Sequence, residues 1–182
     1  MDEQLEFLKI IVTRLGSAGI AYMVTGSLAM AAYAVPRMTR DIDIVIECRP
    51  EDADRIGGLF ATDCYVDIES VREAIARRTM FNIIHNRWII KADFIVRKDE
   101  KYREMEFSRR RPLRIEETTI FVVAPEDLIL SKLIWSTESG SNVHNRDAVS
   151  IAKSVTDLDW NYLKKWAKTL YIEDLLEEVK KA

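Results

Sequence analysis

One apolar strand that carries two aspartates constrains the fold and the chemistry of this chain most. Between Asp41 and Glu47 every second residue is an isoleucine, which predicts a strand with one buried face. Asp41 and Asp43 project from the opposite face, because side chains two residues apart on a strand point the same way. Two carboxylates held this close repel each other, and a divalent cation such as Mg²⁺ relieves that repulsion through their oxygens. The alternative is an ordinary solvated strand end.

A third aspartate interrupts a later apolar segment. Residues 88–96 are predicted to form a strand, and Asp93 lies within it although aspartate is disfavoured in strands. Lys91, Asp93 and Ile95 would share one face. If this strand neighbours the first, three carboxylates converge, and they could hold two Mg²⁺ ions against substrate phosphates. The alternative is a charge on an edge strand or in a loop.

A Gly-Ser pair between a strand and a helix completes this pattern. Residues 21–24 are predicted to form a buried strand, and residues 28–33 a short helix with Ser27 as its N-cap. Backbone N–H groups at a helix start bind phosphate oxygens, and Gly26 allows the backbone to approach them closely. Gly26 and Ser27 would therefore suit a nucleoside triphosphate. Taken alone, such a pair is more often a plain turn or cap.

Mixed strand and helix patterns continue to about residue 124, and helices alone follow. We predict an α/β fold of the α+β type, with an α/β core at residues 1–124 and a helical region at 125–182. The two should pack as one body, because no Pro-, Gly- or Ser-rich linker separates them. The predicted helices are 2–18, 28–33, 50–61, 69–78, 126–136, 145–154, 159–170 and 172–181, and the predicted strands are 21–24, 41–47, 80–85, 88–96, 113–116 and 119–123.

Composition excludes several classes of protein. The 182 residues are 48% hydrophobic and carry a net charge of −3, unlike a dedicated duplex-DNA binder or a protein drawn to anionic membranes. No apolar run reaches the roughly 20 residues that span a bilayer. The acidic N-terminus does not resemble a signal peptide, and Cys48 and Cys64 lack metal-ligand spacing. We expect a cytoplasmic protein with free thiols and no membrane partner.

One stretch is strongly basic. Residues 97–114 hold eight basic and four acidic residues, with Tyr102 and Phe107 between them. Such a segment could contact RNA through phosphates and base stacking. We favour the simpler interpretation, a mobile charged loop.

Taken in order, these motifs resemble the nucleotidyltransferase superfamily, which has the DNA-polymerase-β-like fold. Its pattern is a hydrophobic residue with Gly-Gly or Gly-Ser, then two acidic residues separated by one hydrophobic residue, then an acidic residue on a later strand. The chain is similar in particular to the AbiEii-like group of minimal nucleotidyltransferases, which includes toxins paired with antitoxins. The matching segments, which lie between about residues 20 and 155, are Val24–Ser27, Asp41–Ile44, Ala92–Phe94, Pro125–Leu133 and Arg146-Asp147.

The resemblance implies a nucleotidyltransferase-type mixed sheet flanked by helices and a Mg²⁺-dependent enzyme. The enzyme would transfer a nucleoside monophosphate from an NTP to an acceptor hydroxyl. Asp41, Asp43 and Asp93 would bind two metal ions, and Asp93 would also assist deprotonation of the acceptor. Gly26 and Ser27 would hold the triphosphate.

Four further residues are candidates for the same site. The resemblance implies that Lys132 neutralises phosphate charge and that Asp147 corresponds to an acidic residue needed in toxin relatives. Arg40, like Arg37, flanks the aspartate pair and is a candidate phosphate contact. The alternatives are a solvated helix position for Lys132, an ordinary N-terminal helix turn for Asp147 and plain surface arginines.

The acceptor stays open at this point. The toxin-like relatives suggest a tRNA 3′ end and an antitoxin protein as partners. A protein side chain or an aminoglycoside-type small molecule would also supply a hydroxyl. The alternative function is a catalytically silent nucleotide- or RNA-binding regulatory module with the same fold.

Overall fold

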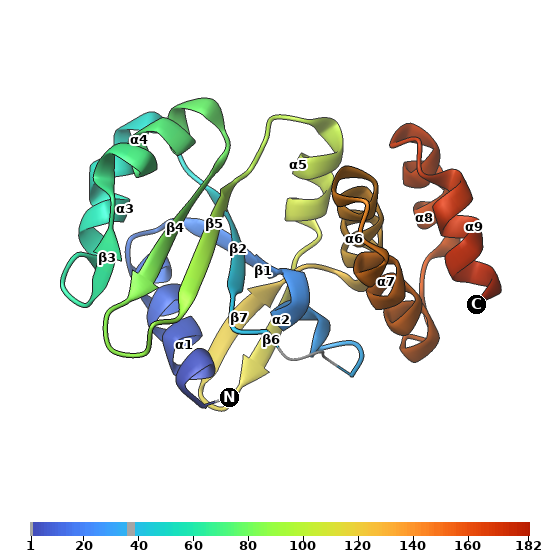
Figure 1. The fold of residues 1–182 in the computed structure, drawn as a ribbon, viewed down its shortest axis with the longest axis horizontal. Coiled ribbons are helices and arrows are strands. Elements are labelled where there is room, and N and C mark those ends of the chain that lie inside the picture. Colours follow the sequence, from blue (N-terminus) through green and yellow to red (C-terminus); the bar gives the residue numbers. More distant parts are fainter. Residues whose placement is uncertain (1, 36–38) are drawn as a thin grey trace.

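A mixed seven-stranded sheet flanked by helices forms the centre of the described chain, as predicted (Figure 1). The computed structural model describes residues 2–35 and 39–182, so Arg37 lies outside the described residues. The strand order across the sheet is β3-β4-β5-β2-β1-β7-β6. The strands are β1 (Ala21–Thr25), β2 (Ile42–Glu47), β3 (Cys64–Val66), β4 (Met80–His85), β5 (Lys91–Val96), β6 (Arg111–Ile115) and β7 (Thr118–Val122).

Apart from α1 and α2, the helices lie in two groups, one on each side of the strands (Figure 1). Helices α3 and α4 lie on one side of the strands in this view, and α5 to α9 lie on the other, with α8 and α9 farthest out. The helices are α1 (Asp2–Ser17), α2 (Gly26–Met30), α3 (Ala53–Phe60), α4 (Ile68–Arg77), α5 (Lys101–Ser108), α6 (Pro125–Ser139), α7 (Asn142–Ser154), α8 (Trp160–Thr169) and α9 (Glu173–Lys181), with a 3-10 turn at Pro50–Asp52.

Strand β2 has the predicted two faces. It pairs antiparallel with β1 and parallel with β5, so it lies in the middle of the sheet. Ile42, Ile44 and Ile46 are fully buried, whereas the residues between them are only partly buried. Phe94 of β5, which is paired with Ile44, packs against Phe60 of α3 with 5.5 Å between ring centroids. The isoleucine face therefore forms the core beneath α3, and the opposite face carries the carboxylates.

The bounds of two elements next to the carboxylates differ from the prediction. The helix that we predict at 28–33 begins two residues earlier, and its N-cap is Thr25 rather than Ser27, with no side-chain cap bond. The strand predicted at 88–96 begins only at Lys91, because residues 86–90 form a wide turn in which Ile89 has a φ of 52°. The two strands pair antiparallel, so they form a hairpin, but five residues connect them where the predicted bounds leave only Asn86 and Arg87. Strand β3, only three residues long, was not predicted at all.

The basic stretch is not a mobile loop. Residues 97–114 contain α5 and most of β6, and Tyr102 and Phe107 are buried. Five of its arginines form ion pairs with acidic side chains, which leaves less free positive charge than the sequence suggests. These arginines are Arg97, Arg103, Arg109, Arg111 and Arg114.

The remaining features agree with the sequence where they can be compared. Cys48 and Cys64 are both free and buried. Over residues 2–35 and 39–182, none of the helices has the length and apolar character needed to cross a membrane. The predicted boundary between the two parts of the chain coincides with the start of α6 at Pro125, and the division itself stays a prediction.

Candidate active site

Two of the three predicted carboxylates lie side by side in the sheet. Asp43 of β2 is paired in parallel register with Asp93 of β5, so the two residues are direct neighbours on adjacent strands. On the other side of β2, Asp43 is paired with Thr25, the last residue of β1. Asp41 precedes β2 and is exposed. The strand pairing therefore brings the Asp43 and Asp93 side chains together on one face of the sheet, and Asp41 lies just outside the pairing.

Gly26 lies directly against Asp43. A Cβ atom at position 26 would overlap the Asp43 carboxylate, and Gly26 has a φ of +68°, a conformation that other residues adopt only with strain. Glycine is therefore required here for two separate reasons. It brings the backbone at the end of β1 into contact with the carboxylate of β2.

The carboxylates influence one another electrostatically. Burial first, and then the neighbouring charges of Asp93 and Asp41, raise the pKa of Asp43 from 3.8 to about 6. The charges of Lys132 and Lys91 act in the opposite direction. A proton or a cation at Asp43 would relieve this repulsion. A raised carboxyl pKa in a cluster of like charges is typical of a functional site.

Lys91 is a member of the site to which the sequence assigned no role. Its Nζ lies 2.8 Å from Asp93 Oδ2 and 3.7 Å from Asp41 Oδ2. The hydrogen bond to Asp93, above all, raises the pKa of Lys91, so the ammonium stays charged. The spacing of Lys91 and Asp93 places them on one face, which was the available signal. The approach of Asp41 from the neighbouring strand could not be inferred from that spacing.

Lys132 and Asp147 form a buried ion pair beside Ser27. Lys132 Nζ lies 2.6 Å from Asp147 Oδ2 and donates to Ser27 Oγ at 3.5 Å. Lys132 is 1% exposed and Asp147 is 5% exposed. A solvated helix position for Lys132 and an ordinary first helix turn for Asp147 are therefore both wrong. A buried lysine held next to a strand–helix junction is placed to meet an anion there.

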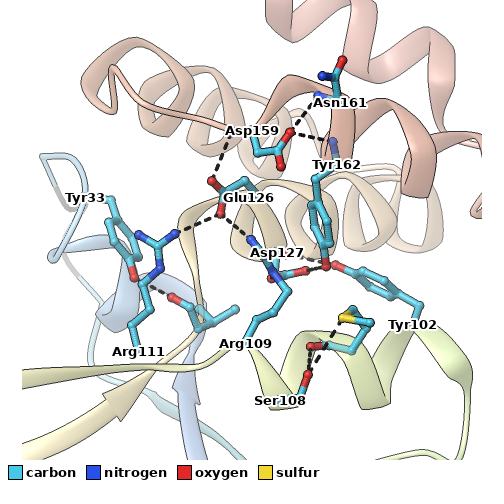
Figure 2. Close-up of polar contacts among 12 residues, drawn as sticks. Tyr33, Tyr102, Ser108, Arg109, Arg111, Glu126, Asp127, Asp159, Asn161 and Tyr162 are labelled. Atoms are coloured by element: carbon cyan, nitrogen blue, oxygen red, sulfur yellow. Dashed lines mark hydrogen bonds and ion pairs between the residues drawn. The ribbon is translucent and has the colours of Figure 1, made fainter.

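The acidic residues of the segment Pro125–Leu133 lie in the first turn of α6, where they contact neighbouring elements (Figure 2). Glu126 is 2% exposed, and its Oε2 lies 3.0 Å from Arg109 and 3.5 Å from Arg111. Its Oε1 accepts a hydrogen bond from the backbone N–H of Asp159 at 3.2 Å, just before α8. Glu126 thus ties α6 to the segment that links α5 and β6 and to the start of α8.

Asp127 makes a second set of contacts in the same turn (Figure 2). Its Oδ2 accepts a hydrogen bond from Arg109 Nε at 2.9 Å, and its Oδ1 accepts one from the Tyr162 hydroxyl at 2.5 Å. The Arg109 guanidinium also stacks over the Tyr162 ring at 3.9 Å. Glu126 and Asp127 therefore fix the start of the helix, and Lys132, less than two turns later, reaches the site.

The carboxylate oxygens of the site are suitable ligands for a hard divalent cation, although they do not form a complete set of ligands around one point. In the described part of the chain, no three His, Cys, Asp or Glu side chains are already gathered as a metal-binding group. However, Asp93 is 7% exposed, and its Oδ1 is buried without a hydrogen-bond partner among the described residues. A buried carboxylate oxygen that lacks a donor is costly, and a cation would satisfy it.

Most of the predicted site residues come together. Gly26, Ser27, Asp43, Asp93 and Lys132 are linked by the contacts above, and Asp147 and Asp41 join them through Lys132 and Lys91. Arg40 is exposed at the position before Asp41, and its phosphate contact stays a prediction.

Solved structures agree with this architecture. A nucleotidyltransferase-like antigenic protein from Paracoccidioides brasiliensis has a TM-score of 0.60 at 17% identity, with 100% of this chain and 94% of that chain covered. A putative nucleotidyltransferase from Thermotoga maritima has a TM-score of 0.55 at 19% identity, with 80% and 92% covered. The chain has the nucleotidyltransferase fold.

A third similar structure is that of an antibiotic-resistance factor. ANT(2″)-Ia, solved in complex with adenylyl-2″-tobramycin, has a TM-score of 0.59 at 13% identity, with 94% of this chain and 99% of that chain covered. Comparison with sequence-family profiles and with curated proteins gives no match. At these identities the shared feature is the nucleotidyltransferase fold.

Proposed function

We propose that this protein is a divalent-cation-dependent nucleotidyltransferase that transfers a nucleoside monophosphate from an NTP to an acceptor hydroxyl. The observation that carries the proposal is the parallel pairing of Asp43 with Asp93, next to Gly26 and the buried Lys132. Carboxylates would hold the cation, and a lysine with a glycine-lined backbone would hold the phosphates. The fold supports the same reaction class.

In this mechanism the protein mainly positions the two reactants and neutralises the charge of the phosphates. Asp41, Asp43 and Asp93 would hold Mg²⁺, which stabilises the charge on the reacting phosphates when bound. Gly26 and Ser27 would bind the triphosphate through backbone N–H groups and a hydroxyl.

The protein's remaining groups handle the proton and the leaving group. The acceptor oxygen attacks the α-phosphorus, the bond from that phosphorus to the β-phosphate oxygen breaks, and pyrophosphate leaves. Asp93 assists removal of the acceptor proton. Lys132, which Asp147 orients at 2.6 Å, supplies a positive charge to the triphosphate.

Calorimetry tests the site directly. Wild type titrated with a non-hydrolysable NTP in Mg²⁺ should bind it, and Asp43→Ala should lose at least tenfold in affinity. Asp174→Ala, at an exposed position of α9, is the matched control and should bind as wild type. The proposal is wrong if wild type binds no nucleotide with Mg²⁺, or if Asp43→Ala binds it equally well.

The acceptor hydroxyl that we propose first is a tRNA 3′ end, which follows from the resemblance to AbiEii-like toxins. That reading would make the protein the toxin of a pair with an antitoxin protein. Incubation with labelled NTPs and total RNA should then label a tRNA-sized band. Label on protein alone would contradict the tRNA reading.

An aminoglycoside-type small molecule is the second candidate, and the similarity to ANT(2″)-Ia favours it. Adenylylation of tobramycin with no label on RNA would support it. A catalytically silent binding module is the remaining alternative. It would bind the NTP and release no pyrophosphate with any of these acceptors.

A further inference from the structure

Lys91 lies between two of the three carboxylates. Its Nζ lies 2.8 Å from Asp93 Oδ2 and 3.7 Å from Asp41 Oδ2, so one ammonium spans carboxylates from two neighbouring chain segments. The Lys91 side chain is 39% exposed, whereas that of Asp93 is 10% exposed. A lysine ammonium is a compact point charge on a flexible stem, and it can neutralise carboxylates much as a bound ion does.

Within the described part of the chain, one oxygen of the Asp93 carboxylate lacks the partner that the other oxygen has. Asp93 Oδ1 is buried and has no partner among the described residues, although Asp93 Oδ2 is paired with Lys91. Asp43 is the direct neighbour of Asp93 in the sheet, and Gly26 packs against its carboxylate. The Asp93 carboxylate is therefore divided, with one oxygen supplied with a cation by the chain and the other not.

We propose that Lys91 is a built-in cation of this site, so that the site takes one divalent cation where two were expected. The inference rests on the proposed function, because the carboxylates must hold a cation at all. Lys91 and one divalent cation together balance the three carboxylate charges. Removal of the ammonium would leave Asp41 and Asp93 Oδ2 free for a second ion.

The number of bound ions tests this inference. Mn²⁺ binding is measured by electron paramagnetic resonance, with a non-hydrolysable NTP present, on the full chain. Wild type should bind one Mn²⁺ per chain, and Lys91→Met should bind two. Lys91→Arg keeps the charge and should still bind one. Lys98→Met, which removes an exposed lysine outside the site, is the matched control and should also bind one.

The outcomes separate this inference from the proposed function. Two ions in wild type, or one ion in Lys91→Met, overturn the role of Lys91 and leave the nucleotidyltransferase proposal standing. Absence of both Mn²⁺ and NTP binding in wild type and in Lys91→Met overturns both. Circular dichroism checks that each variant is folded, and Lys91→Gln replaces Lys91→Met if the latter is not.

Discussion

Gly26 and Asp43 restrict each other at the scale of single residues. The positive φ of Gly26 directs the end of β1 against the Asp43 carboxylate, and no side chain fits between them. The carboxylate in turn lies beside Asp93, so any displacement of Asp43 changes the whole cluster. The glycine therefore acts on the geometry of the acidic residues as well as on backbone access.

Gly26→Ala tests this coupling. The added Cβ has to displace Asp43 and to accept a left-handed backbone, so the free energy of unfolding should fall by about 1–2 kcal/mol. NTP affinity in Mg²⁺ should fall at least tenfold by calorimetry. Gly58→Ala is the control, because a Cβ there meets open space on α3 and should leave binding unchanged. NTP binding by Gly26→Ala at wild-type affinity would contradict the argument.

The raised pKa of Asp43 predicts a pH dependence of stability in cation-free buffer. The folded carboxyl titrates at about 6 and the unfolded one near 3.8, so the folded state holds the proton between these values. The free energy of unfolding should therefore fall as pH rises from 4 to 7, by at most about 3 kcal/mol from this group.

Asp43→Asn supplies the reference for that measurement, because it lacks the titrating group. Chemical denaturation of both proteins in EDTA gives the difference between them at each pH. Wild type should lose stability relative to Asp43→Asn as pH rises through 6. If the free energy of unfolding of wild type relative to Asp43→Asn stays constant or rises with pH, then burial and like charge do not raise the pKa of Asp43.

The sequence could predict the acidic residues of the site but not all of their partners. Alternation placed Asp43 on the polar face of its strand, and the apolar surroundings marked Asp93. Lys91 was assigned to the right face, yet its contact with Asp41 depends on the neighbouring strand. The alternation along one strand predicts the face to which a side chain points. The side chains that it contacts on a neighbouring strand depend on the register between the two strands.

At the scale of elements, α6 connects the site to the rest of the chain. Its first turn is held by Glu126 and Asp127, and its second turn presents Lys132 to Ser27 and Asp147. Since the helix is rigid, the contacts of the first turn also set the position of the lysine. The arginine that serves both acidic residues is Arg109.

Arg109→Met should lower the free energy of unfolding by about 3 kcal/mol, because it leaves two buried carboxylates without their main cation. Chemical denaturation measures the effect. Arg114→Met is the matched control, since Arg114 and Glu117 are both exposed, and it should stay within about 0.5 kcal/mol of wild type. Equal losses in the two variants would contradict a special role for Arg109.

Elements were predicted well where the pattern was long and local. The apolar periods of α1 and the C-terminal helices gave nearly the observed bounds. The charges of residues 97–114 predict a solvated loop, but several of them pair with residues distant in sequence, such as Glu47 and Glu126. Strand β3 could not be predicted, because three residues are too few to show an alternation of apolar and polar side chains.

At the scale of the molecule, contacts join the α/β part to the helical part. Tyr102 of α5 packs against Trp166 of α8 with 5.2 Å between ring centroids, and Lys132 reaches Ser27 from α6. Each of these contacts joins a residue before the predicted boundary, at residues 124 and 125, to a residue after it. We therefore expect the two parts to unfold together.

Unfolding followed by two probes tests this expectation. The fluorescence of a Trp88→Phe variant reports only on residues 125–182, which hold the remaining tryptophans, whereas far-UV circular dichroism also reports on the rest of the chain. The two denaturation curves of this variant should coincide, as in a single cooperative transition. Separate midpoints would indicate that the helical part unfolds on its own.

The contact between Ser27 and Lys132 also has a consequence for synthesis. The two residues are 105 positions apart in sequence, and Asp147 lies further on. A chain emerging from the ribosome exposes its N-terminal strands first. The carboxylates are therefore made well before the lysine that belongs beside them. The site cannot be complete until α7 has been translated, so an unfinished chain cannot begin the proposed reaction.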